Sequence, residues 1–178
     1  MKTETKTKKF FVRAAVMLVM LLTATTAWAQ TTEQEGDWQY SYDSGTNILT
    51  ITSYEGTDAS VTTPTMLGGH AVTAIGDQCF WKDTYMTSVT VSEGVTTIGE
   101  NAFSECSYLA NVSLPNSLVS IGQNAFAECS ALTSITIPSS VTSIGRFAFQ
   151  HSGLTDLYYA GTKAQWNSVS LGNAIFFA

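Results

Sequence analysis

Apolar residues recur along this chain with a fixed 23-residue period from residue 73 onwards. Each repeat contains an Ile-Gly pair, and a phenylalanine follows the isoleucine after five positions. The isoleucines are Ile75, Ile98, Ile121 and Ile144, and the phenylalanines are Phe80, Phe103, Phe126 and Phe149. A constant period of this length indicates a repeat architecture in which each repeat forms one structural unit.

The polar and apolar positions within one repeat predict a short strand followed by turns. Residues 132–137 alternate between apolar and polar side chains, which favours a strand with one face buried. Pro138 then ends the strand, because it cannot donate a ladder hydrogen bond, and Gly145 should allow the chain to bend. A single coil cannot cover its own apolar face, so we expect a mainly β solenoid of 23-residue coils with parallel strand ladders and short turns or 3-10 segments. The isoleucines and phenylalanines should form its core.

The repeats also resemble a known family. Residues 109–129 follow the pattern L-x-x-I-x-I-P-x-x-V-x-x-I-G-x-x-A-F-x-x-C with conservative changes, and residues 132–152 reproduce it with serine in the last position. This pattern is similar to that of the BspA-like leucine-rich-repeat family of bacterial surface proteins. The resemblance implies a right-handed leucine-rich-repeat solenoid that is exported and used for adhesion or protein binding. It implies no catalytic residues.

The sequence also predicts a division of the chain. We expect a signal peptide over 1–29, a polar tail over 30–35, an N-terminal cap over 36–72 and about four coils over 73–157. The cap should bury Ile48, Leu49 and Ile51 and turn at Gly68-Gly69. Residues 158–178 should form a C-terminal cap, with an end that is either natural or truncated. In that cap we expect Trp166, Val169, Leu171, Ile175 and Phe176 to cover the last coil.

The stretch from Met1 to Ala29 has the layout of a secretory signal peptide. A basic leader precedes an apolar run over 14–22, and Ala27-Trp28-Ala29 supplies an A-x-A cleavage site. The apolar run is shorter than the roughly 20 residues needed to span a bilayer. We therefore expect cleavage after Ala29, export to the cell surface or the medium, and no membrane span in the mature chain.

Cleavage would change the charge balance. Five of the eight basic residues and one of the fourteen acidic residues lie in the leader, which leaves 3 − 13 = −10 for the mature chain. A net charge of that sign disfavours binding to nucleic acid.

Candidate catalytic chemistry is sparse. The three cysteines should be buried, and Cys106 and Cys129 occupy the same repeat position, so either free thiols or a disulfide between adjacent coils is compatible with the sequence. Asn101 and Asn124 also align, which suggests a structural amide ladder. No nucleophile elbow, phosphate loop or zinc-protease motif is present, and we expect no cofactor and no enzyme activity.

One further row could carry chemistry, because Lys82, Glu105, Glu128 and His151 share one edge of the predicted solenoid. A solvated edge with weak ion pairs is the simpler interpretation. A weak metal-binding or pH-sensitive site at Glu128 and His151 is the alternative. A glycan-active enzyme would need two carboxylates facing each other across a groove, and we expect no groove at this edge.

The outward positions of the predicted strands form a candidate binding face. It comprises Ser88, Thr90, Asn111, Ser113, Ser134, Thr136, Asp156 and Tyr158. A second polar row lies on another side, at Thr96, Thr97, Val119, Ser120, Thr142 and Ser143. Threonine at these positions can simply reflect its preference for strands. Rows of threonine can also order water on a solenoid, but the rows here mix Ser, Asn and Asp irregularly, which disfavours that role. Repeat solenoids often bind through such faces, which favours a non-catalytic extracellular protein that mediates adhesion or binds a protein or glycan of unknown identity. The alternative is a purely structural envelope repeat without a specific ligand.

Overall fold

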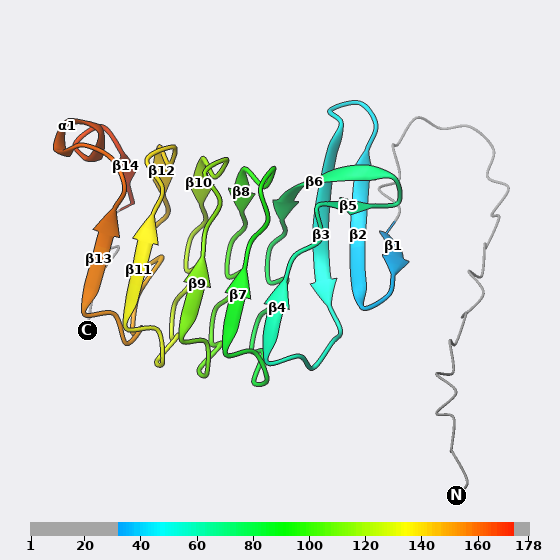
Figure 1. Cartoon of the computed structure of the whole chain (residues 1–178), viewed down its shortest axis with the longest axis horizontal. Helices are drawn as coiled ribbons and strands as arrows, with labels where there is room; N and C mark the ends of the chain where they lie inside the picture. The colour runs from blue at the N-terminus through cyan, green and yellow to red at the C-terminus, as the bar shows by residue number, and fades with distance from the viewer. Residues whose placement is uncertain (1–31, 173–178) are drawn as a thin grey trace, which may run out of the picture.

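The computed structural model describes residues 32–172 and shows a solenoid whose coils stack along its long axis (Figure 1). Each coil contributes short strands joined by turns, and the one helix within residues 32–172, α1, covers only Lys163–Trp166. Equivalent residues of successive coils pair in parallel, as the 23-residue period requires. The predicted fold class, a leucine-rich-repeat solenoid with parallel ladders, is confirmed.

One side of the solenoid carries five strands, which we call the strand face. These are β4 (Ser60–Thr62), β7 (Ser88–Thr90), β9 (Asn111–Ser113), β11 (Ser134–Ile137) and β13 (Asp156–Tyr159). They lie side by side in Figure 1, but hydrogen-bonded pairing joins only β4-β7-β9 and, separately, β11-β13. Because pairing stops between β9 and β11, we call this boundary the seam of the strand face. The last coil is one residue shorter than the others, as the pairing of Ser134 with Asp156 shows.

A second side carries one continuous sheet, which we call the Ile-Gly sheet. Its strands in order are β1 (Thr32–Glu35), β2 (Trp38–Asp43), β3 (Ile48–Tyr54), β6 (His70–Ile75), β8 (Thr97–Ile98), β10 (Ser120–Ile121), β12 (Ser143–Ile144) and β14 (Ser170–Leu171). The isoleucines of the repeat lie in register, Ile75 with Ile98, Ile98 with Ile121 and Ile121 with Ile144. All four isoleucines are buried.

The third side is a turn edge, where the four repeat phenylalanines form a column. Neighbouring rings are nearly parallel, with centroid separations of 4.8 Å, 5.1 Å and 5.7 Å from Phe80 to Phe149. These separations lie within the favourable range for aromatic pairs. Backbone hydrogen bonds of 2.8 Å join Phe80 to Ala102, Phe103 to Ala125 and Phe126 to Ala148, so the turn edge is linked from coil to coil without strands.

The repeat glycines are required by close contact between coils. A Cβ atom on Gly122 would lie 2.5 Å from the carbonyl carbon and oxygen of Gly99, and one on Gly145 would lie 2.4 Å from the amide nitrogen of Gln123. Real Cβ contacts essentially never reach that distance. Neither glycine has a positive φ, so close packing between coils, and not a left-handed backbone, accounts for glycine at these positions.

The N-terminal end differs from its predicted division in three ways. Residues 32–35 form β1, paired antiparallel with β2, where a polar tail was expected, because Tyr40 anchors it through a 2.9 Å hydrogen bond to Glu33. Ile48 is 45% exposed instead of packed down, whereas Leu49 and Ile51 are buried. The strand face begins at β4, inside the region predicted as a cap. Gly68 and Gly69 do form the turn between β5 (Met66–Leu67) and β6, both with positive φ.

The C-terminal end contains α1 and then extends the repeat array with β14. Ser143 pairs with Ser170 in parallel register, so part of the predicted cap belongs to the Ile-Gly sheet. Thr162 and Gln165 form a reciprocal capping box at the start of α1. Val169 is buried and Trp166 packs against the core, but Leu171 is 41% exposed because β14 is the outer strand. Ile175 and Phe176 lie outside the described residues.

Candidate binding face

The structure places the eight predicted face residues on four strands of the strand face. Seven are exposed and Ser88 is half-buried. The residues between them on each strand point the other way, and Val89 and Ile135 are each only 2% exposed. This alternation follows from the period of two in a β-strand. The predicted positions therefore form one outward surface.

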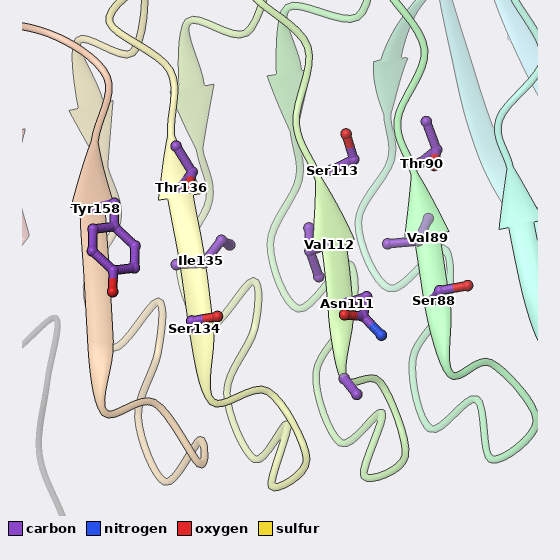
Figure 2. Close-up of a pocket in the computed structure, with 11 residues that line it drawn as sticks. Ser88, Val89, Thr90, Asn111, Val112, Ser113, Ser134, Ile135, Thr136 and Tyr158 are labelled. Carbon is purple, nitrogen blue, oxygen red and sulfur yellow. The ribbon is translucent and has the colours of Figure 1, made fainter.

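A shallow hollow of about 290 Å³ lies in the middle of this surface (Figure 2). The residues that line it include seven of the eight predicted ones, namely Ser88, Thr90, Asn111, Ser113, Ser134, Thr136 and Tyr158. Asp156 is not part of the lining. The hollow spans the seam and contains hydroxyl, amide and phenol groups but no charged side chain.

The seam results from missing hydrogen bonds between coils. The Asn111 amide donates to the Thr87 carbonyl at 3.2 Å, and the Val91 amide donates to the Ser113 carbonyl at 2.9 Å. Among the described residues, the equivalent bonds from Ser134 to Ala110 and from Leu114 to Thr136 are not formed. Val112 and Leu114 are also only partly buried. The coil of β9 thus packs less tightly on its successor than on its predecessor.

Sequence reasoning missed one strand of this face, β4. Ser60, Val61 and Thr62 pair in register with Ser88, Val89 and Thr90, and the Ser60 and Ser88 hydroxyls are 3.0 Å apart. The tripeptide Ser-Val-Thr occurs at both places in the sequence. Its spacing of 28 rather than 23 hid the match, although the identical tripeptide was an available signal.

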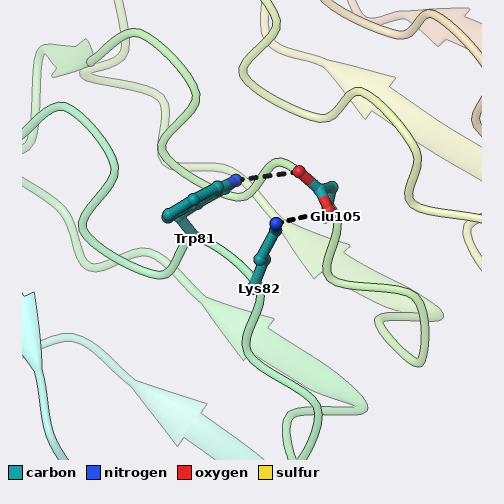
Figure 3. A network of polar contacts seen from close by, with 3 residues as sticks. All are labelled: Trp81, Lys82 and Glu105. Carbon is teal, nitrogen blue, oxygen red and sulfur yellow. Dashed lines mark hydrogen bonds and ion pairs between the residues drawn. The ribbon is translucent and has the colours of Figure 1, made fainter.

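The turn edge holds the second set of candidate residues. The Lys82 ammonium lies 3.2 Å from a Glu105 carboxylate oxygen and 4.3 Å from the centre of the Trp81 ring. The Trp81 indole N–H donates to the other Glu105 oxygen at 3.1 Å (Figure 3). Within residues 32–172, Glu128 and His151 form no ion pair, and no three His, Cys, Asp or Glu side chains gather as for a metal.

Both predicted rows of the turn edge occupy a left-handed backbone conformation. Gln78, Asn101 and Asn124 have φ between 53° and 57°, and Lys82, Glu105, Glu128 and His151 have φ between 53° and 63°. Asparagine tolerates this conformation well, which explains Asn101 and Asn124. The expected amide ladder is not formed, because the Asn101 amide donates to Glu100 at 3.3 Å instead.

The cysteines are buried free thiols. The Cys106 thiol donates to the Phe80 carbonyl at 3.0 Å, and the Cys129 thiol donates to the Phe103 carbonyl at 3.1 Å. Burial raises the pKa of Cys106 to about 12 and raises the pKa values of Cys79 and Cys129 as well. Because the thiolate is the reactive form, these groups are poor nucleophiles near neutral pH. The cysteines serve as core residues.

No helix in the described part of the chain has the length and apolar character needed to cross a bilayer. The predicted signal peptide and its cleavage site lie outside the described residues.

Comparisons with known proteins address the family directly. The family model described as BspA type leucine rich repeat region matches residues 60–174 in six copies. No match was found among curated proteins.

Solved structures share the fold. The crystal structure of a leucine-rich repeat protein from Bacteroides capillosus is similar at 32% identity and a TM-score of 0.66, over 73% of this chain and 99% of that one. A leucine rich cell surface protein from Faecalibacterium prausnitzii is similar in fold, at 21% identity and a TM-score of 0.62, over 78% of this chain and 42% of that one. The pneumococcal vaccine antigen PcpA is similar in fold, at 24% identity and a TM-score of 0.58, over 67% of this chain and 29% of that one. The chain therefore belongs to the BspA-type leucine-rich-repeat family.

Proposed function

We propose that this chain is an exported, non-catalytic repeat protein that binds an extracellular protein or glycan through its strand face. One observation carries the proposal. Seven of the eight outward side chains predicted from the repeat line a single hollow on β7, β9, β11 and β13. A solenoid that aligns outward residues from several coils offers a continuous surface for a partner.

The chemistry of the hollow suits a polar partner. Its hydroxyl and amide side chains donate and accept hydrogen bonds, and the Tyr158 ring, at 57% exposed, adds apolar contact area. The hollow contains no charged side chain, so a partner would bury no charge of this protein there. The missing ladder bonds at the seam also leave backbone groups without a partner on the neighbouring coil.

The groups that could take part in catalysis do not favour it on the strand face. The cysteine thiols are buried and have raised pKa values, and no carboxylate lines the hollow. A glycan-active enzyme acting there would need a pair of carboxylates. A binding role is therefore better supported than catalysis on the strand face.

A matched pair of substitutions on one coil tests the proposal. Thr136 lies on the strand face and Thr142 lies beside β12 on the Ile-Gly sheet, and both are exposed threonines. We expect Thr136→Arg to weaken saturable binding to immobilised matrix proteins or glycans at least tenfold, through a bulky charge in the hollow. Thr142→Arg should leave that binding unchanged. Equal loss in both variants would contradict the proposal.

The alternative role is a structural envelope repeat without a specific ligand. Failure of the wild-type protein to bind any matrix protein or glycan in the same assay would favour that role. The two roles are separated before any variant is made.

Export is a second part of the proposal and rests on the sequence of residues 1–29. N-terminal sequencing of the protein released by the producing cell should start at Gln30. A start at Met1 in the membrane fraction would contradict cleavage. This measurement does not depend on whether a ligand is found.

A further inference from the structure

A second hollow lies on the turn edge, away from the strand face. Its volume is about 360 Å³, and it is lined by Gln78, Trp81, Asn101, Ser104, Glu105, Asn124, Ala127, Glu128, Gln150 and His151. We call it the turn-edge groove. Its presence corrects the expectation that no groove accompanies the acidic rows of this edge.

The groove exists because one repeat position holds a small residue in two neighbouring coils and a large residue in the coil on either side. That position is occupied in successive coils by Trp81, Ser104, Ala127 and Gln150. Ser104 and Ala127 are each 6% exposed and form a floor of small side chains between a tryptophan and a glutamine. Neighbouring coils are about 4.8 Å apart along the ladder, so two small positions leave room about 10 Å long. That length suits a short, compact ligand.

The backbone around the groove is fixed. Lys82, Glu105 and Glu128 donate backbone hydrogen bonds of 3.0 Å, 2.8 Å and 2.8 Å to the next coil. A rigid frame lowers the entropy lost when a ligand binds. The two glutamates also adopt a left-handed conformation, which is unfavourable for an ordinary residue with a Cβ atom. Glycine or asparagine would avoid that cost, so backbone stability does not account for carboxylates at these two positions.

An aromatic ring whose orientation is fixed by polar contacts lies at one end of the groove. Trp81 is 46% exposed, and its indole N–H is bonded to Glu105, which also pairs with Lys82 (Figure 3). These contacts hold the indole while nearly half of the residue remains in water. An oriented, exposed ring of this kind can pack against the apolar face of a ligand.

The other lining groups present hydrogen-bonding capacity to the solvent. The side-chain amides of Asn124 and Gln150 form no hydrogen bond to protein within residues 32–172, and Glu128 has no ion pair there. An amide both donates and accepts, and a carboxylate accepts at two oxygens. Such groups together match the closely spaced hydroxyls of a sugar ring.

The charges exclude anionic ligands. Lys82 is already paired with Glu105, and Glu128 adds a negative charge to the lining. Phosphate, sulfate or sialic acid would meet a carboxylate and no available lysine or arginine in the groove. We propose that the turn-edge groove binds one or two rings of a neutral oligosaccharide, with Trp81 as the stacking surface and Asn124, Glu128 and Gln150 as hydrogen-bonding groups.

This site is separate from the strand face, so it stands or fails independently of the proposed function. The test is a titration of the isotopically labelled protein, starting at Gln30, with laminarihexaose, mannohexaose, cellohexaose and chitotetraose. The indole N–H signal of Trp81 and the side-chain amide signals of Asn124 and Gln150 report directly on the groove. We expect at least one sugar to shift all three signals saturably, with a dissociation constant on the order of 1 mM, typical of an open site.

Three variants locate the binding. Trp81→Ala should weaken it at least tenfold, and Ala127→Gln should block it by filling the floor. Asn124→Gly removes the amide but keeps a residue that accepts φ of 53°, so it should fold normally and weaken binding about fivefold, the value of one hydrogen bond. Tyr108→Ala is the control, because this tyrosine is 61% exposed and does not line the groove. If Ala127→Gln does not fold, Trp81→Ala and Asn124→Gly still show whether the sugar binds in the groove.

Other outcomes would overturn the proposal. The proposal fails if no neutral sugar shifts the three signals at about 20 mM, which is 20 times the expected dissociation constant. The proposal also fails if sialyllactose, or peptides from a gelatin digest, shift the same signals at lower concentration than the neutral sugars do. Binding that is lost in Thr136→Arg but kept in Trp81→Ala would assign the sugar to the strand face. That result would overturn the groove and support the proposed function.

Discussion

The Ile-Gly sheet and the strand face are made by the same coils, yet only the former is continuous. From β3 to β14 every neighbouring pair of strands in the Ile-Gly sheet is hydrogen-bonded. On the strand face the ladder stops between β9 and β11. The difference cannot come from the period, because β10 and β12 pair across the same 23-residue step that separates β9 from β11. It comes from the residues that each sheet places where neighbouring coils touch.

Glycine permits close backbone contact in one sheet, whereas side-chain packing sets the spacing of the strands in the other. Backbone atoms of Gly99 and Gly122 approach so closely that no Cβ fits between them. The strand face has no equivalent glycine, so its spacing depends on how deeply Val89, Val112 and Ile135 are buried, and Val112 is only partly buried. The continuous sheet therefore acts as the support, and the less tightly packed face holds the hollow.

The largest effect should come from adding a methyl group to the continuous sheet. Gly122→Ala places a Cβ 2.5 Å from the carbonyl of Gly99. We expect the free energy of unfolding to fall by about 3 kcal/mol, the upper end for overpacking, because backbone on both sides must move. Urea unfolding followed by circular dichroism measures this change.

Gly69→Ala is the matched control. Gly69 has a φ of 81° and no heavy atom within 4 Å of the added Cβ, so only conformational strain should act. The expected loss is about 1–2 kcal/mol. If Gly122→Ala cost no more than Gly69→Ala, close contact would not be what makes the Ile-Gly sheet continuous.

A valine pair gives a smaller effect on the strand face. Val89 is 2% exposed, and we expect Val89→Ala to lower the free energy of unfolding by about 2 kcal/mol. Val112 occupies the equivalent position beside the seam and is only partly buried, so Val112→Ala should cost about 1 kcal/mol. Equal losses in the same unfolding assay would show that the seam is packed as well as the rest of the face.

Much of the fold followed from the sequence because the repeat dictates it. The positions of Phe80, Phe103, Phe126 and Phe149 already required one column, since stacked coils place equal positions above one another. Outward positions such as Thr136 followed from the alternation along a strand. Both inferences depend on local periodicity, which a single sequence displays.

Features that break the period could not be read in the same way. The separation of β4 from β7 is longer than one regular repeat, and β1 forms from a polar segment whose partner strand is set by tertiary contacts. The seam depends on the depth of burial of Val112, which its residue type does not reveal. The turn-edge groove depends on the size difference between Trp81 and Ala127, visible in the sequence only once the turn edge is known.

The smallest effect, and the most local one, is in amide hydrogen exchange. The amides of Leu114 and Ser134 lack the coil-to-coil bonds that Val91 and Asp156 make to Ser113 and Thr133. We expect the two seam amides to exchange at least tenfold faster than the two bonded amides, because exchange there needs no opening of the ladder. Exchange measured by nuclear magnetic resonance at neutral pH resolves the four amides. Similar protection of all four would mean that β9 and β11 pair in solution, and the backbone groups at the hollow would then have partners on the neighbouring coil.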